Sequence, residues 1–443
     1  MIEKLLIANR GEIALRIVRA CKDLGIKSVV AHSTADRNTM AVALADEAVC
    51  IGSPPTEESY LKIDNIIMAA CLTRCDAIHP GIGFLSEHAG FAKSVEAAGL
   101  IFIGPTSETI ALLGNKVAAR TVARGAGVPI TPGGEEALRD LADAKATASR
   151  LGYPVILKAS SGGGGRGMRI VREEGEMESA YALARKEAAL FFSDPALHIE
   201  RYIKDPRHIE VQVVSDGQGG VVHLGERDCS VQKNHQKLFE ESPACALDDT
   251  LIAEMRACSV SLFKTLGYRG VGTVEFLVDG RTFYFMEVNA RLQVEHPVSE
   301  VVSGVDLVRT QIEIAQGTRL RFSQHDIVLS GYALECRING LGAGTIKRLR
   351  LPAGPHVRTD TYLEEGSVLS PYYDSLLAKI IVSAKNRTEG LAVMERALDE
   401  VVIEGIPTNL DEQRLILKSR RFTRAMLSTN LYDEVITNGR SNG

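Results

Sequence analysis

Three oxygen-bearing side chains, Glu275, Glu287 and Asn289, lie in two apolar segments separated by Asp279 and Gly280. An Asp-Gly pair between apolar runs predicts a β-hairpin, which would return Glu287 and Asn289 to the neighbourhood of Glu275. Carboxylates among apolar neighbours are costly to bury unless they are paired or bound to a metal. Two carboxylates and an amide oxygen suit magnesium bridging nucleotide phosphates. The alternative is that they are solvent-facing positions of alternating strands.

Directly after this hairpin, Arg291, Gln293 and Glu295 alternate with apolar residues. If the segment is extended, the three side chains share one face, because the side-chain period of a strand is two. A planar cation, an amide and a carboxylate on one face can hold a small oxyacid and remove its proton. The alternative is an ordinary stripe of surface ion pairs. Next to a metal-binding hairpin, the pattern indicates a substrate pocket.

A glycine-rich stretch at residues 162–167 follows Lys158. Gly162, Gly164 and Gly167 formally fit GxGxxG, but that motif opens a helix in a dinucleotide-binding fold, whereas this stretch links two predicted strands. Successive glycines let backbone N–H groups close over phosphates, and Lys158 can place a point charge on them. A protein kinase is unlike this pattern because its lysine follows the loop, and HRD and DFG elements are absent. A flexible surface loop is the alternative to a nucleotide lid.

A polar cluster spans residues 226–237 and follows the apolar run 221–224. Its side chains include acids, bases and amides that could line a polar site. The alternative is a solvated loop.

The N-terminal part of the chain alternates strand and helix patterns. Apolar strands are predicted at residues 5–8, 28–31, 76–79 and 100–103. The first helix has an apolar face and ends at Gly25, in the position of a helix cap. Strands that alternate with helices predict a parallel sheet, here in an α/β domain that ends near residue 105. A Rossmann dehydrogenase is not indicated, because no GxGxxG turn follows the first strand.

The rest of the chain reads as two further regions. A helix carrying Lys116, Arg120 and Arg124 leads into a small segment, with a helix at about 137–151 and strands at 154–158, 168–171 and 197–203. A mixed region extends from residue 210 to about 320. The last block begins at residue 331, with strands at 332–338 and 379–382 and then helices. The chain therefore contains several domains, as its 443 residues also suggest.

The composition excludes some classes of protein. A formal net charge of −5 argues against a nucleic-acid or membrane-surface protein, since both favour a basic excess. No apolar run reaches the length of a transmembrane helix, and the N-terminus lacks a secretory layout. The eight cysteines are scattered and predict buried free thiols. We expect a cytoplasmic protein.

Together these motifs resemble the biotin carboxylase branch of the ATP-grasp superfamily, over nearly the whole chain. The most specific segments are residues 153–168, around the glycines, and residues 285–296, which contain the metal and substrate residues. Residues 5–14, 79–87, 226–237, 335–339 and 405–409 add independent support.

The resemblance implies a multidomain fold of α/β and α+β type. Its parts are an N-terminal parallel-sheet α/β domain at residues 1–114, an ATP-grasp domain at 115–330 with a mobile lid at about 131–203, and a C-terminal biotin carboxylase domain at 331–443. Members use ATP, magnesium (or manganese) and bicarbonate to carboxylate biotin carried on a separate protein, and they are usually homodimers. A biotin-bearing Met-Lys-Met segment is absent. We therefore expect a separate biotin carboxyl carrier protein and separate carboxyltransferase subunits.

The resemblance also assigns roles to individual residues. Those expected around ATP are Lys116, Lys158, Gly163, Gly164, Gly165, Arg166, Gly167, Glu200, Arg201, Tyr202, Ile203, His208, Gln232, His235, Glu275 and Glu287. Those expected to hold the metal ions are Glu275, Glu287 and Asn289. Those expected to bind bicarbonate are Lys237, Arg291, Gln293 and the backbone of Val294. Glu295 is expected to be the base that deprotonates bicarbonate, and Arg337 the cation that stabilises the biotin enolate.

Two positions depart from the family pattern. Ile82 replaces the usual tyrosine of the His-Pro-Gly-x-Gly motif, and the segment after Arg337 is shortened to Asn339 and a glycine-rich run through Thr345. Neither change touches the expected ATP or metal positions.

Several alternatives to this function remain open from the sequence. The chain could be another ATP-grasp ligase, although residues 291–295 and Arg337 suit bicarbonate and a ureido acceptor. It could be an inactive paralogue that only assembles a complex, although the expected catalytic residues are all present. Acetyl-CoA carboxylase, serving fatty-acid synthesis, is the default complex. A propionyl-CoA, pyruvate or 2-oxoacid carboxylase is the alternative, since that choice resides in the transferase.

Overall fold

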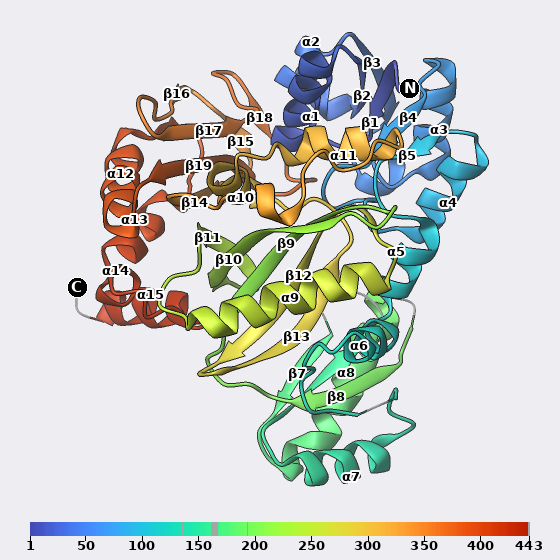
Figure 1. Ribbon diagram of the computed structural model, residues 1–443. Helices are drawn as coiled ribbons and strands as arrows, with labels where there is room; N and C mark the ends of the chain where they lie inside the picture. Colours follow the sequence, from blue (N-terminus) through green and yellow to red (C-terminus); the bar gives the residue numbers. More distant parts are fainter. Residues whose placement is uncertain (135, 161–166, 193, 442–443) are drawn as a thin grey trace.

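The computed structural model describes residues 1–134, 136–160, 167–192 and 194–441 (Figure 1). From blue to red, the chain forms an N-terminal region, a projecting lid, a central sheet and a C-terminal region. Among the described residues, no helix has the length and apolar character needed to cross a membrane. The eight cysteines are free, as predicted, and four of them are buried.

The N-terminal region is built on a parallel sheet, as predicted. Its strands are β1 (Lys4–Ile7), β2 (Lys27–Ser33), β3 (Glu47–Gly52), β4 (Ala77–His79) and β5 (Ile101–Phe102). They lie in the order β3-β2-β1-β4-β5, and each pair of neighbours is parallel. Strand β3 was not predicted, although residues 48–51 are apolar; it is an edge strand and is mostly exposed or half-buried.

Helices cover this sheet, and the first of them ends as its sequence predicts. They are α1 (Gly11–Leu24), α2 (Met40–Leu44), α3 (Ile63–Leu72), α4 (Ala89–Ala97) and α5 (Ser107–Gly114), with short 3-10 turns η1 (Thr34–Asp36) and η2 (Thr56–Glu58). After α1, Gly25 adopts a left-handed conformation with φ 68°, and its N–H donates to the carbonyls of Cys21 and Lys22. Glycine adopts this conformation at little cost, so it ends the helix here.

The lid is a small antiparallel sheet with two helices packed against it. Its elements are α7 (Leu141–Leu151), β6 (Val155–Ala159), β7 (Met168–Val171), η3 (Glu174–Glu176), α8 (Met177–Phe192) and β8 (Leu197–Arg201), reached through α6 (Lys116–Gly125). The strand order is β7-β6-β8, so the glycine-rich stretch does link two antiparallel strands, as predicted. Helix α7 begins later than predicted, because the Asp140 side chain caps it by accepting the Asp143 N–H.

The central sheet is antiparallel and joins the middle and C-terminal parts of the chain. Its strands are β9 (Arg207–Asp216), β10 (Val221–Lys233), β11 (Gln236–Ser242), β12 (Arg269–Asp279), β13 (Thr282–Asn289), β14 (Tyr332–Asn339), β17 (Val357–Thr361) and β19 (Leu376–Ala384). They lie in the order β13-β12-β9-β10-β11-β14-β19-β17. The pairing of β11 with β14 therefore brings residues near Arg337 beside residues near Lys237.

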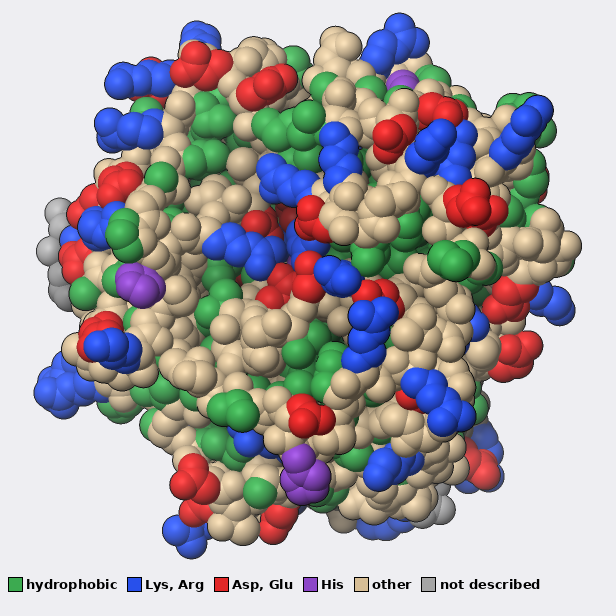
Figure 2. Space-filling view, turned by 45° about the horizontal axis from the view of Figure 1, so that its top comes forward, with side chains coloured by type: hydrophobic (Ala, Val, Ile, Leu, Met, Phe, Trp, Pro, Cys, Tyr) green, Lys and Arg blue, Asp and Glu red, His purple; other side chains and the backbone are tan. Residues whose placement is uncertain are grey.

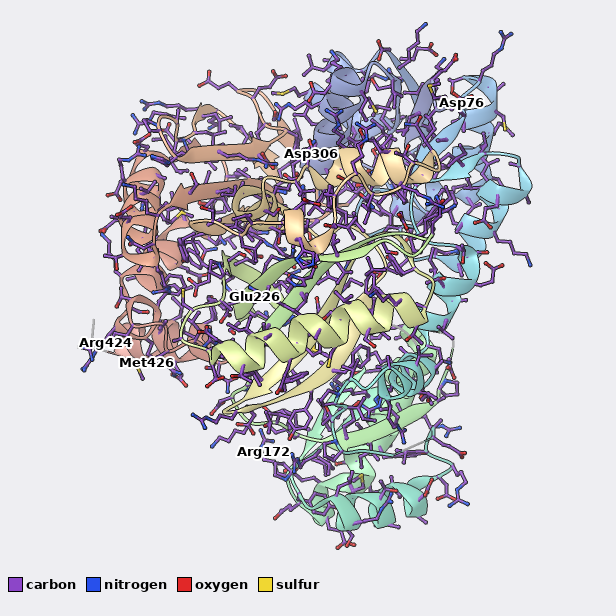
Figure 3. All side chains as sticks on the ribbon, viewed as in Figure 1. Asp76, Arg172, Glu226, Asp306, Arg424 and Met426 are labelled. Atoms are coloured by element: carbon purple, nitrogen blue, oxygen red, sulfur yellow. The ribbon has the colours of Figure 1, made fainter. Side chains whose placement is uncertain are left out.

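The polar residues 226–237 are strand and not a solvated loop. They form the end of β10 and the start of β11, joined by a tight turn in which Asn234 and His235 both have positive φ. Such a turn matches the twist of the two strands. Glu226 lies near the centre of the molecule (Figure 3), where its Oε2 forms an ion pair with Arg256 Nη2 at 2.5 Å. Charged side chains in these strands therefore point into the interior.

The remaining elements pack around the central sheet. They are α9 (Asp249–Thr265), α10 (His296–Ser303), α11 (Leu307–Ala315), η4 (Gln324–Asp326), β15 (Gly344–Thr345), β16 (Arg348–Arg350), β18 (Val368–Leu369), α12 (Arg387–Glu400), β20 (Val402–Glu404), α13 (Leu410–Lys418), α14 (Arg420–Thr423) and α15 (Leu431–Ser441). Helix α9 runs along the central sheet, and α12 to α15 form the outer wall of the C-terminal region (Figure 1). Strand β15 pairs with β18, and β16 pairs with β20.

Candidate active site

Two predicted site residues, Glu275 and Glu295, and one that was not predicted, Glu210, meet at the ammonium group of Lys237, on β11. Its Nζ lies 2.6 Å from Glu210 Oε2, 3.0 Å from Glu275 Oε1 and 2.5 Å from Glu295 Oε1. These carboxylates come from β9, β12 and the start of α10, so the central sheet and the segment after β13 both contribute. Figure 2 shows acidic and basic side chains gathered in a hollow near the middle of one face. The site is thus a cluster of opposite charges, little of it exposed.

Arg227, on β10, organises the floor of this cluster and was assigned no role from sequence. Its side chain is fully buried, and its guanidinium donates to Glu210 Oε1 at 2.5 Å and to Gln293 Oε1 at 2.6 Å. Further bonds reach Gln212, Ser299 and Thr273. A buried guanidinium with all its donors engaged fixes its neighbours firmly. Glu210 lies between Ile209 and Val211, and this alternation with apolar residues is the sequence signal that could have indicated it, whereas Arg227 lies between Glu226 and Asp228 and carries no such signal.

The predicted hairpin forms, and it places the proposed metal ligands side by side. In the pairing of β12 with β13, Glu275 lies opposite Glu287 and Thr273 lies opposite Asn289. Residues directly opposite one another point to the same face of a sheet. Burial raises the pKa of Glu287, and the neighbouring Glu275 adds to the rise. Two nearby acidic oxygens that disfavour each other's charge are a chemical fit for a divalent cation.

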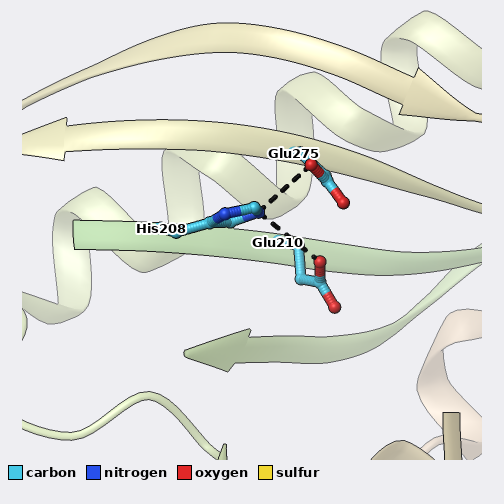
Figure 4. A group of neighbouring side chains, drawn as sticks. All are labelled: His208, Glu210 and Glu275. Atoms are coloured by element: carbon cyan, nitrogen blue, oxygen red, sulfur yellow. Dashed lines mark ion pairs between the residues drawn. The ribbon is translucent and has the colours of Figure 1, made fainter. Parts of the chain in front are cut away.

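A second compact group, His208, Glu210 and Glu275, adjoins the hairpin (Figure 4). His208 Nε2 lies 3.2 Å from Glu275 Oε2 and 3.7 Å from Glu210 Oε2. Its other ring nitrogen, Nδ1, lies 2.8 Å from Gln232 Nε2. His208 and Gln232, which were both predicted to lie beside the nucleotide, are therefore in contact. Although burial opposes it, Lys237 and His208 hold the pKa of Glu275 well below its usual range. Glu275 is therefore an ionised oxygen donor.

The segment after the hairpin is not extended, so the predicted period-two face is wrong. It turns between residues 293 and 296, and Glu295 is the N-cap residue of α10, with φ −81° and ψ 9°. Pro297 near the helix start is the signal for this turn, since proline is favoured at the first position of a helix. The side chains of Gln293 and Glu295 nevertheless both reach the cluster around Lys237. Gln293 Nε2 donates to Glu275 Oε1, and Glu295 Oε1 accepts from Lys237 Nζ.

Arg291 points to a different edge of the site. Its Nε donates to Glu87 Oε2 at 2.8 Å and its Nη2 to Asn289 Oδ1 at 2.9 Å. Glu87 follows β4 and also accepts the Ala290 N–H at 2.9 Å. Glu87 thus ties the N-terminal region to the end of the hairpin, a contact between residues that are far apart in the sequence. The guanidinium of Arg291 remains beside the proposed metal ligand Asn289.

Glu295, at the start of α10, forms an ion pair with Arg337, on β14. Arg337 Nη2 lies 2.8 Å from Glu295 Oε2 and 2.5 Å from Glu240 Oε1. Although burial opposes it, Lys237, Arg337 and Arg227 hold the pKa of Glu295 well below its usual range. Glu295 is therefore an ionised carboxylate at neutral pH, able to accept a proton. The backbone of Arg337 is also held, because its carbonyl accepts Gln413 Nε2 at 2.7 Å.

Glu240 is a buried acid behind Arg337 that the sequence analysis did not single out. Burial raises its pKa to about 7; Glu295 adds to the rise, while Arg337 and Lys237 oppose it. Across the strand pair it lies opposite Glu335, whose pKa burial also raises well above the usual range. Glu240 and Glu335 thus form a buried acid pair beside Arg337.

Glu240→Gln should flatten part of the pH dependence of stability. Between its ordinary pKa of 4.5 and about 7, the folded protein keeps a proton at Glu240 that the unfolded chain has lost. Rising pH therefore lowers the free energy of unfolding of the wild type relative to the variant, by up to about 1.4 kcal/mol per pH unit. Urea midpoints at pH 5, 6, 7 and 8 measure this, with the exposed Glu404→Gln as the matched control. A difference between wild type and Glu240→Gln that is constant over this range would contradict the assignment.

In the lid, Lys158 is held by a buried carboxylate. Its Nζ lies 2.6 Å from Glu200 Oε2, while Arg120 Nη1 and His198 Nε2 contact Glu200 Oε1 at 2.6 and 3.0 Å. Although burial opposes it, Lys158, His198 and Arg120 hold the pKa of Glu200 well below its usual range. Arg120 also donates to the Thr131 carbonyl at 2.7 Å, at the point where the chain enters the lid. Arg120 was noted only as part of a helix face, yet it anchors this network.

The other residues predicted around ATP occupy the junction between lid and central sheet. Burial lowers the pKa of Lys116, against the opposing effect of Glu287, so Lys116 lies within electrostatic reach of the hairpin. The Tyr202 N–H donates to the Pro154 carbonyl, Arg201 contacts the Tyr284 hydroxyl, and Ile203 is buried. His235 is exposed at the turn between β10 and β11. Gly167 precedes β7, whereas Gly163, Gly164, Gly165 and Arg166 lie outside the described residues.

The two departures from the expected pattern leave the cluster around Lys237 intact. Ile82 packs against an apolar core, and its carbonyl accepts Asn9 Nδ2 at 2.9 Å. After β14, the shortened segment is held by its backbone, since the Gly340 N–H donates to the Ser375 carbonyl and the Leu341 N–H to the Pro407 carbonyl. A side chain at Gly340 would meet Leu369 at 2.5 Å, so glycine permits this close return.

Three protein-family models together match nearly the whole chain. The model described as the biotin carboxylase N-terminal domain matches residues 1–110. The ATP-binding domain of the carbamoyl-phosphate synthase L chain matches residues 115–323. The biotin carboxylase C-terminal domain matches residues 340–434.

Individual proteins of known name are similar over the same extent. A biotin carboxylase of Pseudomonas aeruginosa is 50% identical over 432 residues, which covers 96% of each chain. A solved biotin carboxylase from Campylobacter jejuni, in complex with β-γ-ATP, has a TM-score of 0.96 and 44% identity, over 98% of this chain and 99% of that one. The biotin carboxylase domain dimer of Hydrogenobacter thermophilus 2-oxoglutarate carboxylase, solved with MgADP, ADP and bicarbonate, has a TM-score of 0.95 and 43% identity, over 98% of both chains.

Proposed function

Because this chain belongs to the biotin carboxylase family of ATP-dependent ligases, we propose that it carboxylates biotin on a separate carrier protein, using ATP and bicarbonate. The observation that carries the proposal is the cluster around Lys237, which contacts Glu295 on one side and the hairpin residue Glu275 on the other. Such an arrangement lets one cation face both a small anion and the phosphates of a nucleotide.

Bicarbonate is proposed to bind among Lys237, Arg291, Gln293 and the backbone of Val294. It is a weak nucleophile, so its remaining proton must leave as its oxygen attacks the γ-phosphorus of ATP. Glu295 is the proposed base, and its place beside Lys237 and Arg337 supports this role because it brings an ionised carboxylate to the proposed bicarbonate residues. The new P–O bond gives carboxyphosphate, and the bond from the γ-phosphorus to the ADP oxygen breaks.

The nucleotide is proposed to lie between lid and central sheet. Lys116 and Lys158 would contact its phosphates, residues 200–203 its base, and residues 163–167 would close over it. Glu275, Glu287 and Asn289 would hold magnesium, which when bound neutralises charge on the transferring phosphate. The ion pair between Lys158 and Glu200 supports this arrangement, because it keeps a lysine pre-oriented at the mouth of the lid. A closed lid also excludes water from carboxyphosphate.

Carboxyphosphate is proposed to break down to carbon dioxide and phosphate. The phosphate then accepts the proton of the biotin ureido nitrogen, and that nitrogen attacks carbon dioxide. Negative charge develops on the ureido oxygen during this step. Arg337 is proposed to stabilise it, because a positioned cation stabilises developing charge far better in a dry site than in water.

The first experiment is phosphate release from ATP and magnesium, with and without bicarbonate and free biotin. We expect strong stimulation by biotin that is lost when bicarbonate is removed. Activity indifferent to biotin has two explanations, another ligase substrate or a strict need for carrier-bound biotin. Repeating the assay with a biotinylated carrier separates them, since continued indifference would overturn the proposal.

The complex is proposed to be acetyl-CoA carboxylase of the cytoplasm, with separate carrier and carboxyltransferase subunits and a homodimeric carboxylase. The relatives named simply biotin carboxylase are compatible with this choice, and the 2-oxoglutarate carboxylase relative supports an oxoacid complex as the alternative. Labelled bicarbonate, the organism's own carrier and each candidate transferase would decide between acetyl-CoA, propionyl-CoA, pyruvate and 2-oxoglutarate. Sedimentation of the purified chain tests the dimer.

A further inference from the structure

Lys379 is a fully buried lysine that the proposed reaction leaves without a role. It lies in the middle of β19, between the apolar residues Ala378 and Ile380, and its side chain is 0% exposed. Burying an ammonium group is costly unless it is paired and hydrogen-bonded. Its partners therefore show what the position is for.

The ammonium of Lys379 joins the three main regions of the chain. Its Nζ donates to the Val294 carbonyl at 2.9 Å, in the segment that precedes α10. It lies 3.0 Å from Glu12 Oε1, on α1 of the N-terminal region, and 3.8 Å from Asp360 Oδ2, on the neighbouring strand β17. Glu12 and Asp360 neutralise the charge, while Val294 offers only a carbonyl oxygen.

The carbonyl of Val294 belongs to the peptide plane that leads into Glu295. A peptide unit is rigid, so fixing its oxygen fixes the orientation of the next nitrogen and Cα. Glu295 itself, with φ −81° and ψ 9°, is the residue at which the chain turns into α10. Lys379 contacts the peptide that enters this turn, whereas Lys237 contacts the Glu295 carboxylate.

The helix behind Glu295 is held from the same direction. Glu300, on α10, accepts Arg16 Nη2 of α1 at 3.0 Å and Arg358 Nη1 of β17 at 2.7 Å. Arg358 in turn donates to both oxygens of Asp360, next to Lys379. A ring of ion pairs thus runs from α1 through α10, β17 and β19 back to α1. Within it, Lys379 is the member that touches the backbone of the bicarbonate segment.

We propose that Lys379 is a positioning residue for the bicarbonate site, which holds the Val294–Glu295 peptide so that the Glu295 carboxylate meets the substrate. The inference rests on the proposed function, because it needs bicarbonate to be the substrate of this segment. Lys379 touches neither bicarbonate nor nucleotide, and it acts through Val294.

The test compares Lys379→Met with Lys379→Met/Glu12→Gln. The single variant leaves Glu12 buried without Lys379, while Asp360 keeps its ion pair with Arg358, so loss of stability alone could lower its activity. The double variant removes the charge of Glu12 and should recover much of the thermal midpoint. It still leaves the Val294 carbonyl without its donor. Glu12→Gln alone keeps Lys379 and its hydrogen bond, and Lys385→Met, an exposed lysine beyond the end of the same strand, is the matched control.

In both variants that lack Lys379 we expect the KM for bicarbonate to rise, and kcat for bicarbonate-dependent phosphate release to fall, each by about tenfold, since small misplacements of reacting groups cost up to about a hundredfold. The KM for MgATP should change less than about twofold, because the nucleotide residues lie on other elements. Glu12→Gln should change the bicarbonate KM by less than about threefold, and Lys385→Met should match the wild type.

Recovery of both stability and bicarbonate kinetics in the double variant would overturn the inference, because it would show that Lys379 only balances charge. Equal changes in the KM values for MgATP and bicarbonate would do the same. A wild-type protein with no bicarbonate-dependent activity would instead refute the proposed function, so the two failures are distinguishable.

Discussion

Glu295→Gln is expected to lower the turnover of bicarbonate-dependent phosphate release by about a thousandfold while ATP still binds. A general base in position contributes on the order of 10² to 10⁴ in rate. Glutamine keeps the length of the side chain and one oxygen acceptor, but it cannot take a proton. The loss should therefore fall on the chemical step.

The surrounding charges sharpen this expectation. Lys237 Nζ lies 2.5 Å from one oxygen of Glu295 and Arg337 Nη2 lies 2.8 Å from the other. Removing the negative charge leaves both cations less neutralised, so the site should hold an anion at least as well as before. We therefore expect the KM for bicarbonate to stay constant or fall while kcat falls.

Steady-state phosphate release over a range of bicarbonate concentrations measures both constants, and calorimetric titration with ATP measures nucleotide affinity. Glu404→Gln is the matched control, because its side chain is 55% exposed in β20 and forms an ion pair with the exposed Arg348. Unchanged turnover in Glu295→Gln would remove this residue as the base. A raised bicarbonate KM at constant kcat would assign it to binding only.

Arg337→Ala is expected to lower biotin carboxylation by about a hundredfold, the usual cost of losing a donor to developing negative charge. Bicarbonate-dependent cleavage of ATP without biotin should fall by less than about tenfold, because that step needs Glu295 and not the enolate cation. The two activities therefore separate in this variant.

The position of Arg337 makes a second variant necessary. Its removal leaves Glu240 and Glu295 buried close together without the cation between them, which could disturb Glu295 as well. Arg337→Ala/Glu240→Gln relieves that repulsion and should restore ATP cleavage more than carboxylation. The exposed Arg348→Ala is the matched control. Equal losses of both activities in the single and double variants would contradict this division of roles.

The sequence predicted those parts of the site that depend on short-range signals. Asp279 and Gly280 predicted a hairpin, and the hairpin places Glu275 opposite Glu287. The glycines after Lys158 predicted a connection between strands, and β6 and β7 are indeed antiparallel neighbours. Turn and cap preferences act over a few residues, so they can be read without knowing the fold.

The prediction failed where local signals compete. The alternation of polar and apolar residues in 291–295 indicated a shared face on the condition that the segment is extended. The chain instead turns there, since α10 begins at His296 with a proline in its first turn. A solvated loop was the alternative interpretation of the polar residues 226–237, and it is wrong: they form strands, because the charges of Glu226 and Arg227 are satisfied inside the molecule. Alternation alone does not show whether a polar side chain meets water or a buried partner.

The sequence by itself determined the family, the parallel N-terminal sheet and the residues expected to hold nucleotide, metal and bicarbonate; their roles and the domain boundaries stay predictions. Only the tertiary structure decided which side chains support them. Glu87 reaches Arg291, Glu240 reaches Arg337, and Lys379 reaches both Glu12 and Val294. These contacts join strands and helices that are hundreds of residues apart or come from different regions. They depend on strand register and packing, which a local pattern of residue types does not specify.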